Sequence, residues 1–138
     1  MTPATLLFGS NMGDRRAYID AALAMISEAL GSAPVKQTPV IETAALGFEG
    51  PDFLNMAAVF PCSLSPEELL ALCKRTEAVL GRTDPPEYAP DGTRIYHSRT
   101  IDIDILYYGN LVLDSPALTL PHPQTRTRPF VAELLSAL

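Results

Sequence analysis

Short runs of apolar residues alternate along the chain with segments of mixed polarity. Four of the runs have the length of a strand, and they cover residues 4–9, 35–43, 53–60 and 100–108. An apolar run of this length between turn residues is typical of a strand buried in a sheet. Pro39 interrupts the second run and predicts an edge strand or a bulge, because proline cannot donate to a sheet ladder. A further short strand is expected at residues 111–113.

Two segments have the spacing of an amphipathic helix. In the first, apolar residues recur every three or four positions between Asp14, a suitable N-cap, and Gly31, a suitable C-terminal stop. These residues are Ile19, Leu23, Ile26 and Leu30. The second begins with a capping-box sequence at Ser65 and ends at Gly81. A short third helix is expected at residues 129–138.

The order strand–helix–strand–strand–helix–strand predicts an α+β domain of the ferredoxin-like type. In this βαββαβ architecture an antiparallel sheet has its helices packed on one face, and the short C-terminal helix is added to it. We expect one domain over residues 1–138, because a chain of this length forms a single core. Residues 82–98 have no periodicity, and a long loop of that kind in a compact domain is typically functional or disordered.

Composition and charge restrict the function classes. Hydrophobic residues make up 47% of the chain, which excludes a disordered protein. The 10 Lys and Arg against 16 Asp and Glu give a net charge of −6, which argues against binding to nucleic acid or to anionic membranes. No signal peptide or membrane-spanning run is recognisable, so we expect a cytoplasmic protein. Cys62 and Cys73 lie in apolar segments and are expected to be reduced core thiols.

Asp102 and Asp104 are the most informative polar residues. In a strand they point to one face, roughly 7 Å apart, while the flanking isoleucines point to the other face, toward the core. Two neighbouring carboxylates repel each other and are costly to desolvate, and a hard cation such as Mg²⁺ relieves both effects. The alternative is a solvent-facing pair on a half-exposed sheet.

Three arginines lie beside this pair, and together they suggest phosphoryl transfer. Arg82, Arg94 and Arg99 belong to or border the long loop that precedes the two aspartates. Carboxylates that hold a metal, with arginines that stabilise developing charge, are the groups that phosphoryl transfer requires. A solvated, charged loop without chemistry is the alternative.

Other polar residues leave two interpretations open. Asn55 lies in an apolar strand, where its amide must be hydrogen-bonded, either by the backbone or by the edge of a heterocycle. His122 is held between two prolines, for a structural or a functional reason. Gly9 and Gly13 lack the remainder of a Walker or dinucleotide motif and predict a strand-to-helix turn.

Taken together, these segments resemble one family, the 6-hydroxymethyl-7,8-dihydropterin pyrophosphokinases of folate biosynthesis. The resemblance extends over nearly the whole chain, and its most specific stretch is the sequence RTIDIDIL at residues 99–106. The other matching stretches follow in family order: residues 8–15, residues 51–55, Glu77 with Gly81 and Arg82, residues 120–123, and residues 128–131.

The resemblance implies a reaction and a site. ATP and the hydroxymethyl-dihydropterin would give AMP and the pterin diphosphate, with Asp102 and Asp104 holding two Mg²⁺ ions. Arg82 and Arg99 would complete the catalytic set by engaging the phosphates. The pterin would bind at Asn55 and at the backbone of Thr43 and Leu46, between Phe53 and Phe130, with Tyr96 covering a ring. The ATP side would be lined by Lys74, Glu77, Ile105, Thr119, His122 and Arg128.

The sequence also departs from the family pattern. Tyr96 and Ser98 stand where the family usually carries Trp and Pro, and the chain ends at Leu138, earlier than is usual. A catalytically weak pterin- or nucleotide-binding module of the same fold, and an interaction domain without a ligand, are therefore kept as alternatives. The expected partners are small molecules, with a monomer as the expected state and a dimer as the alternative.

Overall fold

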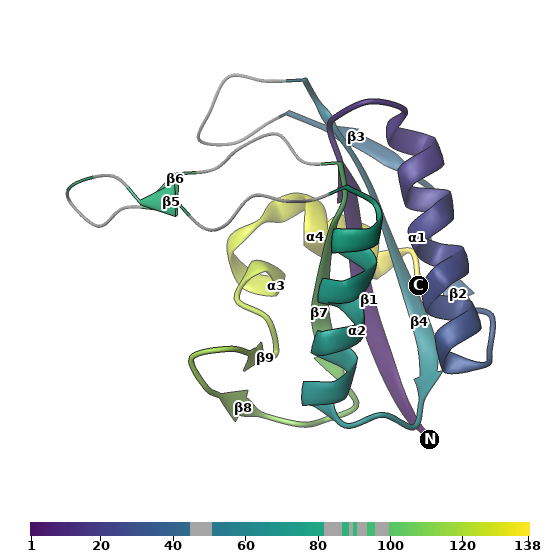
Figure 1. The fold of residues 1–138 in the computed structure, drawn as a ribbon. Helices are drawn as coiled ribbons and strands as arrows, with labels where there is room; N and C mark the ends of the chain where they lie inside the picture. Colours follow the sequence, from purple (N-terminus) through teal and green to yellow (C-terminus); the bar gives the residue numbers. More distant parts are fainter. Residues whose placement is uncertain (45–50, 82–86, 89, 91–93, 96–99) are drawn as a thin grey trace.

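The centre of the molecule is an antiparallel sheet of five strands, seen in a computed structural model that describes residues 1–44, 51–81, 87–88, 90, 94–95 and 100–138 (Figure 1). Its strands follow the order β2 (Lys36–Gln37), β4 (Phe53–Cys62), β1 (Thr2–Ser10) and β7 (Asp102–Tyr108), and β3 (Ile41–Thr43) also pairs with β4. Two small hairpins add β5 (Glu87–Tyr88) with β6 (Arg94–Ile95), and β8 (Leu113–Asp114) with β9 (Thr119–Leu120). The α+β, ferredoxin-like prediction is confirmed.

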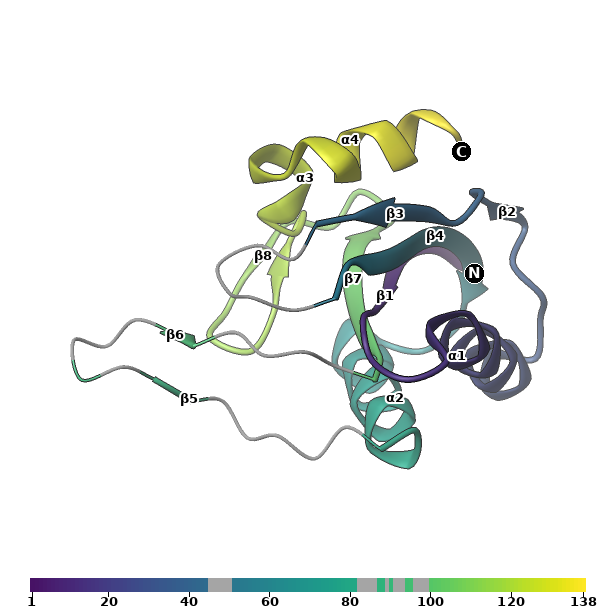
Figure 2. The ribbon, with the colours of Figure 1, turned by 90° about the horizontal axis from the view of Figure 1, so that it is seen from above.

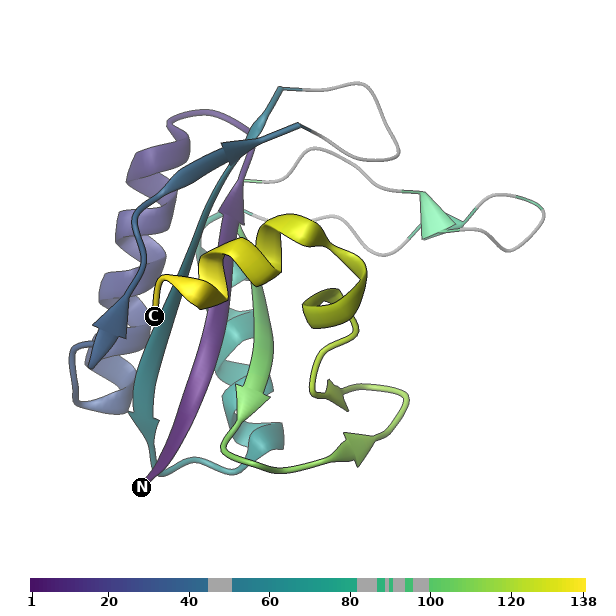
Figure 3. The ribbon, with the colours of Figure 1, turned by 180° about the vertical axis from the view of Figure 1, so that it is seen from behind.

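Helices cover both faces of the sheet. The helices α1 (Arg15–Leu30) and α2 (Pro66–Val79) lie on one face, and α4 (Pro129–Ser136), preceded by the short α3 (Gln124–Thr127), lies across the other (Figures 2 and 3). The prediction that the two helices of the βαββαβ order pack on one face is confirmed for α1 and α2, and the added C-terminal helix covers the opposite face. The C-terminal helix covers this face because the central strands are apolar on both sides, so the second face must also be buried.

The two faces have separate cores, and β1 contributes to both. Leu6 and Phe8 pack with α1 and α2, while Leu7 between them packs with Leu106 and with Val131 of α4. This alternation is the period of two that a strand imposes on its side chains. It places Asp102 and Asp104 on the α4 face, because the isoleucines that alternate with them are buried in the core below α1 and α2.

The helix ends agree with the sequence prediction. Asp14 accepts a hydrogen bond from the N–H of Ala17, and Gly31 ends α1 in the left-handed conformation at φ +72°. Ser65 and Glu68 form the reciprocal capping box that opens α2. Each cap satisfies backbone groups that a helix end leaves unpaired.

The expected strand at residues 35–43 is divided into β2 and β3 around Pro39. At the break, the Thr38 N–H donates to the Ala57 carbonyl at 2.9 Å, and the Thr38 hydroxyl accepts from the Ala57 N–H at 3.0 Å. The hydroxyl thus replaces a backbone acceptor where proline interrupts the ladder. The short strand expected at residues 111–113 is found slightly later, as β8.

The two cysteines are free and buried, as expected. Burial raises the pKa of Cys73 to about 12, with the charges of Glu77 and Asp104 adding to the rise. Burial also raises the pKa of Cys62. Thiols with raised pKa values are poor nucleophiles, so both act as core residues. In the described part of the chain, no helix is long and apolar enough to cross a membrane.

Candidate active site

Asn55, Gly9 and Asp102 form a row across three neighbouring strands. Gly9 of β1 pairs with Asn55 of β4 on one side and with Asp102 of β7 on the other. Residues that pair directly across strands share a face, and this row lies on the α4 face, next to Leu7 of the second core. Since neighbouring strands are ~4.8 Å apart, the Cα atoms of Asn55 and Asp102 are separated by roughly 10 Å.

The centre of this row is Gly9, which has no side chain and is buried. A Cβ atom at Gly9 would lie 3.1 Å from Asn55 Oδ1 and 3.6 Å from Phe53 Cδ1. The first of these distances is tighter than an ordinary van der Waals contact, so even alanine would crowd the Asn55 amide. Glycine therefore allows the Asn55 amide and the Phe53 ring to lie close against β1 at the middle of the row.

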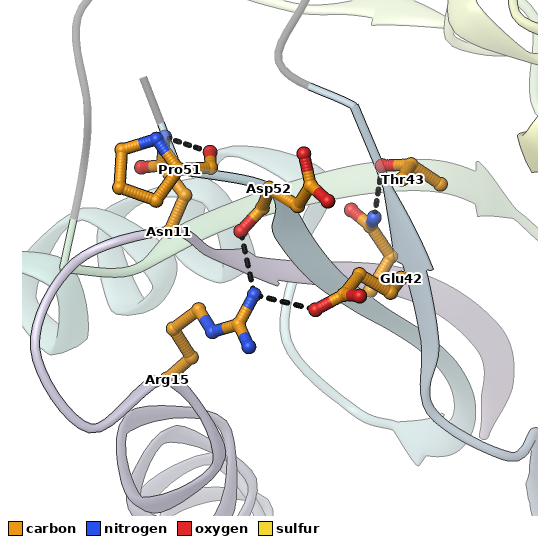
Figure 4. Close-up of polar contacts among 7 residues, drawn as sticks. Asn11, Arg15, Glu42, Thr43, Pro51 and Asp52 are labelled. Atoms are coloured by element: carbon orange, nitrogen blue, oxygen red, sulfur yellow. Dashed lines mark hydrogen bonds and ion pairs between the residues drawn. The ribbon is translucent and has the colours of Figure 1, made fainter.

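The Asn55 amide is buried and held in a fixed orientation. Its Nδ2 donates to Thr43 Oγ1 at 2.7 Å, from the short edge strand β3 (Figure 4). This bond uses one donor of an amide that has two donors and a carbonyl acceptor. Phe53, two residues earlier on the same strand, is half-buried on the same face. The structure thus brings together a polar edge and an aromatic face, the two features that bind a flat heterocycle.

Asp102 and Asp104 are half-buried at the start of β7, and their charges interact. Burial and, after it, the charge of Asp102 raise the pKa of Asp104 to about 7, against the lowering effect of a hydrogen bond from Gln124. A carboxyl pair in this condition favours a cation beside it. Oxygen donors suit Mg²⁺, which commonly completes its shell with phosphate oxygens and water. Among the described residues no third acidic, histidine or cysteine side chain forms a metal cluster with the pair.

Comparison with known proteins identifies the family. The sequence profile of the 7,8-dihydro-6-hydroxymethylpterin-pyrophosphokinase family matches residues 5–138. This chain belongs to that family. It is 35% identical over 136 residues to the 2-amino-4-hydroxy-6-hydroxymethyldihydropteridine pyrophosphokinase of Bacillus subtilis, a match that covers 98% of this chain and 77% of the relative.

Two further relatives extend the comparison. The protein of the same name from Porphyromonas gingivalis is 38% identical over 133 residues, which cover 95% of this chain and 86% of that protein. The mitochondrial folate synthesis bifunctional protein of Pisum sativum is 39% identical over 127 residues, which are 91% of this chain but 23% of that longer protein. The pyrophosphokinase unit therefore occurs both alone and as part of larger proteins.

In this pyrophosphokinase chain, residues 121–124 lie along the outer edge of β7. The His122 N–H donates to the Leu106 carbonyl at 2.9 Å, and His122 Nδ1 accepts from the Gln124 N–H at 3.1 Å. Burial lowers the pKa of His122; the Asp102 charge opposes this, while the charge of Arg128 lowers the pKa further. A neutral ring with Nδ1 as acceptor carries its proton on Nε2, so His122 is a hydrogen-bond donor at that atom.

Gln124 is a site residue that the sequence interpretation did not include. Its Nε2 donates to Asp104 Oδ2 at 2.8 Å, from the first position of α3 to the strand beside it. No sequence signal marks Gln124 as a site residue, because an isolated glutamine in a proline-rich turn resembles an ordinary surface residue. Only the docking of residues 121–124 on β7 brings it to the carboxylate.

Glu77 of α2 contacts β7 from the face opposite to the one that carries Asp102 and Asp104. Its side chain is buried between α2 and the sheet, and its Oε2 accepts a hydrogen bond from the Ile103 N–H at 2.8 Å. Its Oε1 lies 3.9 Å from Lys74 Nζ, which is mostly exposed. Glu77 therefore satisfies a backbone donor at the edge of β7, between the two aspartates in sequence.

The remaining predicted residues are placed as follows. Phe130 is the second residue of α4 and packs, partly buried, against the second core, on the same face as Asn55. Thr119 lies in β9 and Arg128 is the N-cap of α4, and both are half-buried. Ile105 is buried in the core below α1 and α2, so its side chain points away from the carboxylates and only its backbone lies on the site edge. Leu46, Arg82, Tyr96 and Arg99 lie outside the described residues, as does the side chain of Arg94.

Proposed function

We propose that this site transfers the pyrophosphoryl group of ATP to the hydroxymethyl group of 6-hydroxymethyl-7,8-dihydropterin, with Mg²⁺ bound at Asp102 and Asp104. Membership of the pyrophosphokinase family supports the reaction and its place in folate biosynthesis. The observation that carries the proposal is the row Asn55–Gly9–Asp102, which sets an amide suited to a ring edge and a carboxylate on one face of the sheet. The row would thus place the pterin at Asn55 next to Asp102, which would hold Mg²⁺ for the phosphates.

Binding of the acceptor follows from the groups on the Asn55 side. The pterin ring would lie over Gly9, with its polar edge at Asn55 and the Thr43 backbone and its faces against Phe53 and Phe130. Aromatic rings suit a flat heterocycle because they bury its faces without competing for its hydrogen bonds. The hydroxymethyl group would then extend past Gly9, which has no side chain, toward Asp102.

The donor substrate would bind at the edge of β7. His122 would donate from Nε2 to a phosphate oxygen, since its Nδ1 is already an acceptor of the Gln124 N–H. Arg128, Thr119, Lys74 and Glu77 would line this side, with Arg82 and Arg99 completing it. Cationic and N–H donors at developing phosphate charge are the main source of rate in phosphoryl transfer.

The transfer itself requires no covalent intermediate with the protein. The hydroxymethyl oxygen bonds to the β-phosphorus, the bond from that phosphorus to the AMP oxygen breaks, and the hydroxyl proton is released to water. Two Mg²⁺ ions, when bound, supply charge neutralisation of the phosphates and acidify the attacking hydroxyl. Asp102 and Asp104 would hold those ions, and the pterin and nucleotide contacts would supply proximity between the reacting groups. The proposed enzyme is a monomer in the cytoplasm.

The deciding experiment measures AMP release with ATP, the pterin and Mg²⁺ present together or one at a time. Release that requires all three is expected, and Asp104→Ala should lower it at least about 100-fold, as loss of a group that stabilises transition-state charge does. Asp114→Ala, at an exposed aspartate of β8, is the matched control. Binding of both substrates without product would instead indicate the catalytically weak module, and unchanged turnover in Asp104→Ala would overturn the metal assignment.

A further inference from the structure

Arg15 joins two segments that are far apart in sequence and lie beside the pterin side of the site. Its Nη1 donates to Glu42 Oε2 at 2.8 Å and to the Asp52 carbonyl at 2.8 Å (Figure 4). Glu42 belongs to β3, and Asp52 immediately precedes β4. One guanidinium nitrogen therefore links β3 to Asp52, the residue directly before β4.

The residues that follow these two contacts are the ones assigned to the pterin. Thr43 comes directly after Glu42, and Phe53 comes directly after Asp52. The same pair stands opposite in the β3–β4 register, and Thr43 also holds the Asn55 amide. The position of Arg15 thus affects the separation of three groups that would surround the ring.

A second contact supports the same region from the β1–α1 turn. Asn11 is buried, and its Nδ2 donates to the Pro51 carbonyl at 3.1 Å. Asn11 and Arg15 together attach two successive backbone carbonyls, at Pro51 and Asp52, to the β1–α1 turn and the first residue of α1 (Figure 4). A strand as short as β3 is held by few ladder bonds, so such anchors decide how far it moves from β4.

Helix stability does not explain the position of Arg15. A cation in the first turn opposes the helix dipole, and the first turn of α1 holds no acidic residue. The ion pair with Glu42 is largely exposed, at 30% and 52% side-chain accessibility, and exposed pairs contribute little to folding. The contacts of Arg15 are therefore explained best by a local effect on the two segments that it joins, β3 and the start of β4.

We propose that Arg15 is a positioning residue for pterin binding, which acts through Glu42 and Asp52 and not by contact with the substrate. This inference rests on the proposed function. By holding β3 and the start of β4 together, Arg15 pre-organises the ring site, and loss of such pre-organisation weakens binding without removing any contact to the ligand.

The test measures pterin binding directly by calorimetry, with the nucleotide omitted. Arg15→Ala is expected to weaken pterin binding about 5- to 20-fold, the scale of losing one charge-assisted hydrogen bond. Arg15→Lys should recover part of the affinity, because a single ammonium can still reach an acceptor but lacks the rigid fork. ATP binding should stay unchanged in both variants.

Arg16→Ala is the matched control. Arg16 is the next residue of the same helix turn and pairs within α1 with Asp20, at 3.2 Å, so its removal has a similar effect on the helix dipole. Glu42→Gln is a second variant that weakens the link and leaves Arg15 in place, and it should reduce pterin affinity by a smaller factor. It keeps the proposal testable even if Arg15→Ala does not fold.

The outcomes separate the inference from the proposed function. If the unaltered protein binds no pterin, the proposed function fails. If it binds pterin and both Arg15→Ala and Glu42→Gln bind it equally well, the positioning role is wrong. Equal weakening by Arg15→Ala and Arg16→Ala would also overturn it, because a general effect on α1 would then explain the loss.

Discussion

Gln124 donates its side-chain amide to Asp104 Oδ2 at 2.8 Å, across the gap between α3 and β7. The same residue donates its backbone N–H to His122 Nδ1. Gln124 therefore orients a carboxylate proposed to hold a cation and fixes the tautomer of a histidine proposed to meet a phosphate. Outer residues that orient a ligand side chain commonly affect metal affinity as much as rate.

Gln124→Ala is expected to raise the Mg²⁺ concentration required for half-maximal turnover by about 10-fold, the lower end of outer-residue effects. The reason is that Asp104 loses the donor that holds it in one rotamer. Mg²⁺ binding followed by the thermal shift of the protein should weaken in parallel, without any substrate present. Gln37→Ala, at an exposed glutamine of β2, is the control. A Mg²⁺ dependence that does not change in Gln124→Ala would contradict the orienting role.

Local sequence signals predicted much of the fold. The capping box at Ser65, the αL stop at Gly31 and the break at Pro39 each depend on residues close in sequence, and each was confirmed. The face of the aspartates followed from the period of two in β7, since the isoleucines between them are buried. These features needed no knowledge of which strands are neighbours.

The features that were not predicted depend on contacts between residues that are far apart in the sequence. The run Leu6-Leu7-Phe8 shows that β1 is buried on both faces, but it does not say that α4 covers the second face. The role of Gly9 required the register with β4 and β7, and the role of Gln124 required the docking of α3 on β7. The resemblance to a known family named Asn55 and the aspartates, but the row that joins them is a property of the sheet.

Gly9→Ala is expected to weaken pterin binding at least about 10-fold while ATP binding stays unchanged. The added Cβ would lie 3.1 Å from Asn55 Oδ1, and Asn55 cannot move away without lengthening its 2.7 Å bond from Nδ2 to Thr43. Small steric insertions of this kind typically cost about 1–3 kcal/mol. Calorimetry with pterin alone measures the effect, and ATP binding in the same variant is the internal control. Equal pterin affinity in both proteins would show that the ring does not lie over Gly9.

Asp104→Asn is expected to stabilise the metal-free protein at pH 8 but not at pH 4. The pKa of Asp104 is raised in the folded state from 3.8 to about 7, so below pH 3.8 the group is neutral in both states and costs nothing. As the pH rises from about 4 to 7, the unfolded state loses a proton that the folded state retains, and stability falls. The gain at pH 8 should be about 1–3 kcal/mol, reduced from the full shift because Asp104 keeps some contact with water.

Urea denaturation in the presence of a chelator measures this difference at each pH. Asparagine keeps an oxygen that accepts the Gln124 amide, so the comparison isolates the carboxylate charge. Asp114→Asn, at an exposed site, should change stability little at either pH. A constant difference between Asp104→Asn and the unaltered protein from pH 4 to pH 8 would show that the carboxyl has an ordinary pKa.

Glu77→Ala is expected to destabilise the protein by about 1–3 kcal/mol, whereas Glu77→Gln should change stability little. Alanine leaves the buried Ile103 N–H without its side-chain acceptor, which normally costs this amount. Glutamine retains a carbonyl oxygen at the same position and removes only the negative charge near Asp104, which contributes to the raised pKa of that residue. Urea denaturation at neutral pH measures both variants, with Glu133→Ala at an exposed position of α4 as the control.

Glu77→Gln also separates the two roles assigned to this residue. If Glu77 acts mainly as an acceptor at the edge of β7, the glutamine variant keeps both its stability and its KM for ATP. If the carboxylate also contacts the nucleotide, the KM for ATP rises at unchanged stability, because the charge is lost and the acceptor remains. A glutamine variant as unstable as Glu77→Ala would contradict the edge role, since it would mean that the charge, and not the hydrogen bond to Ile103, holds this part of β7 in place.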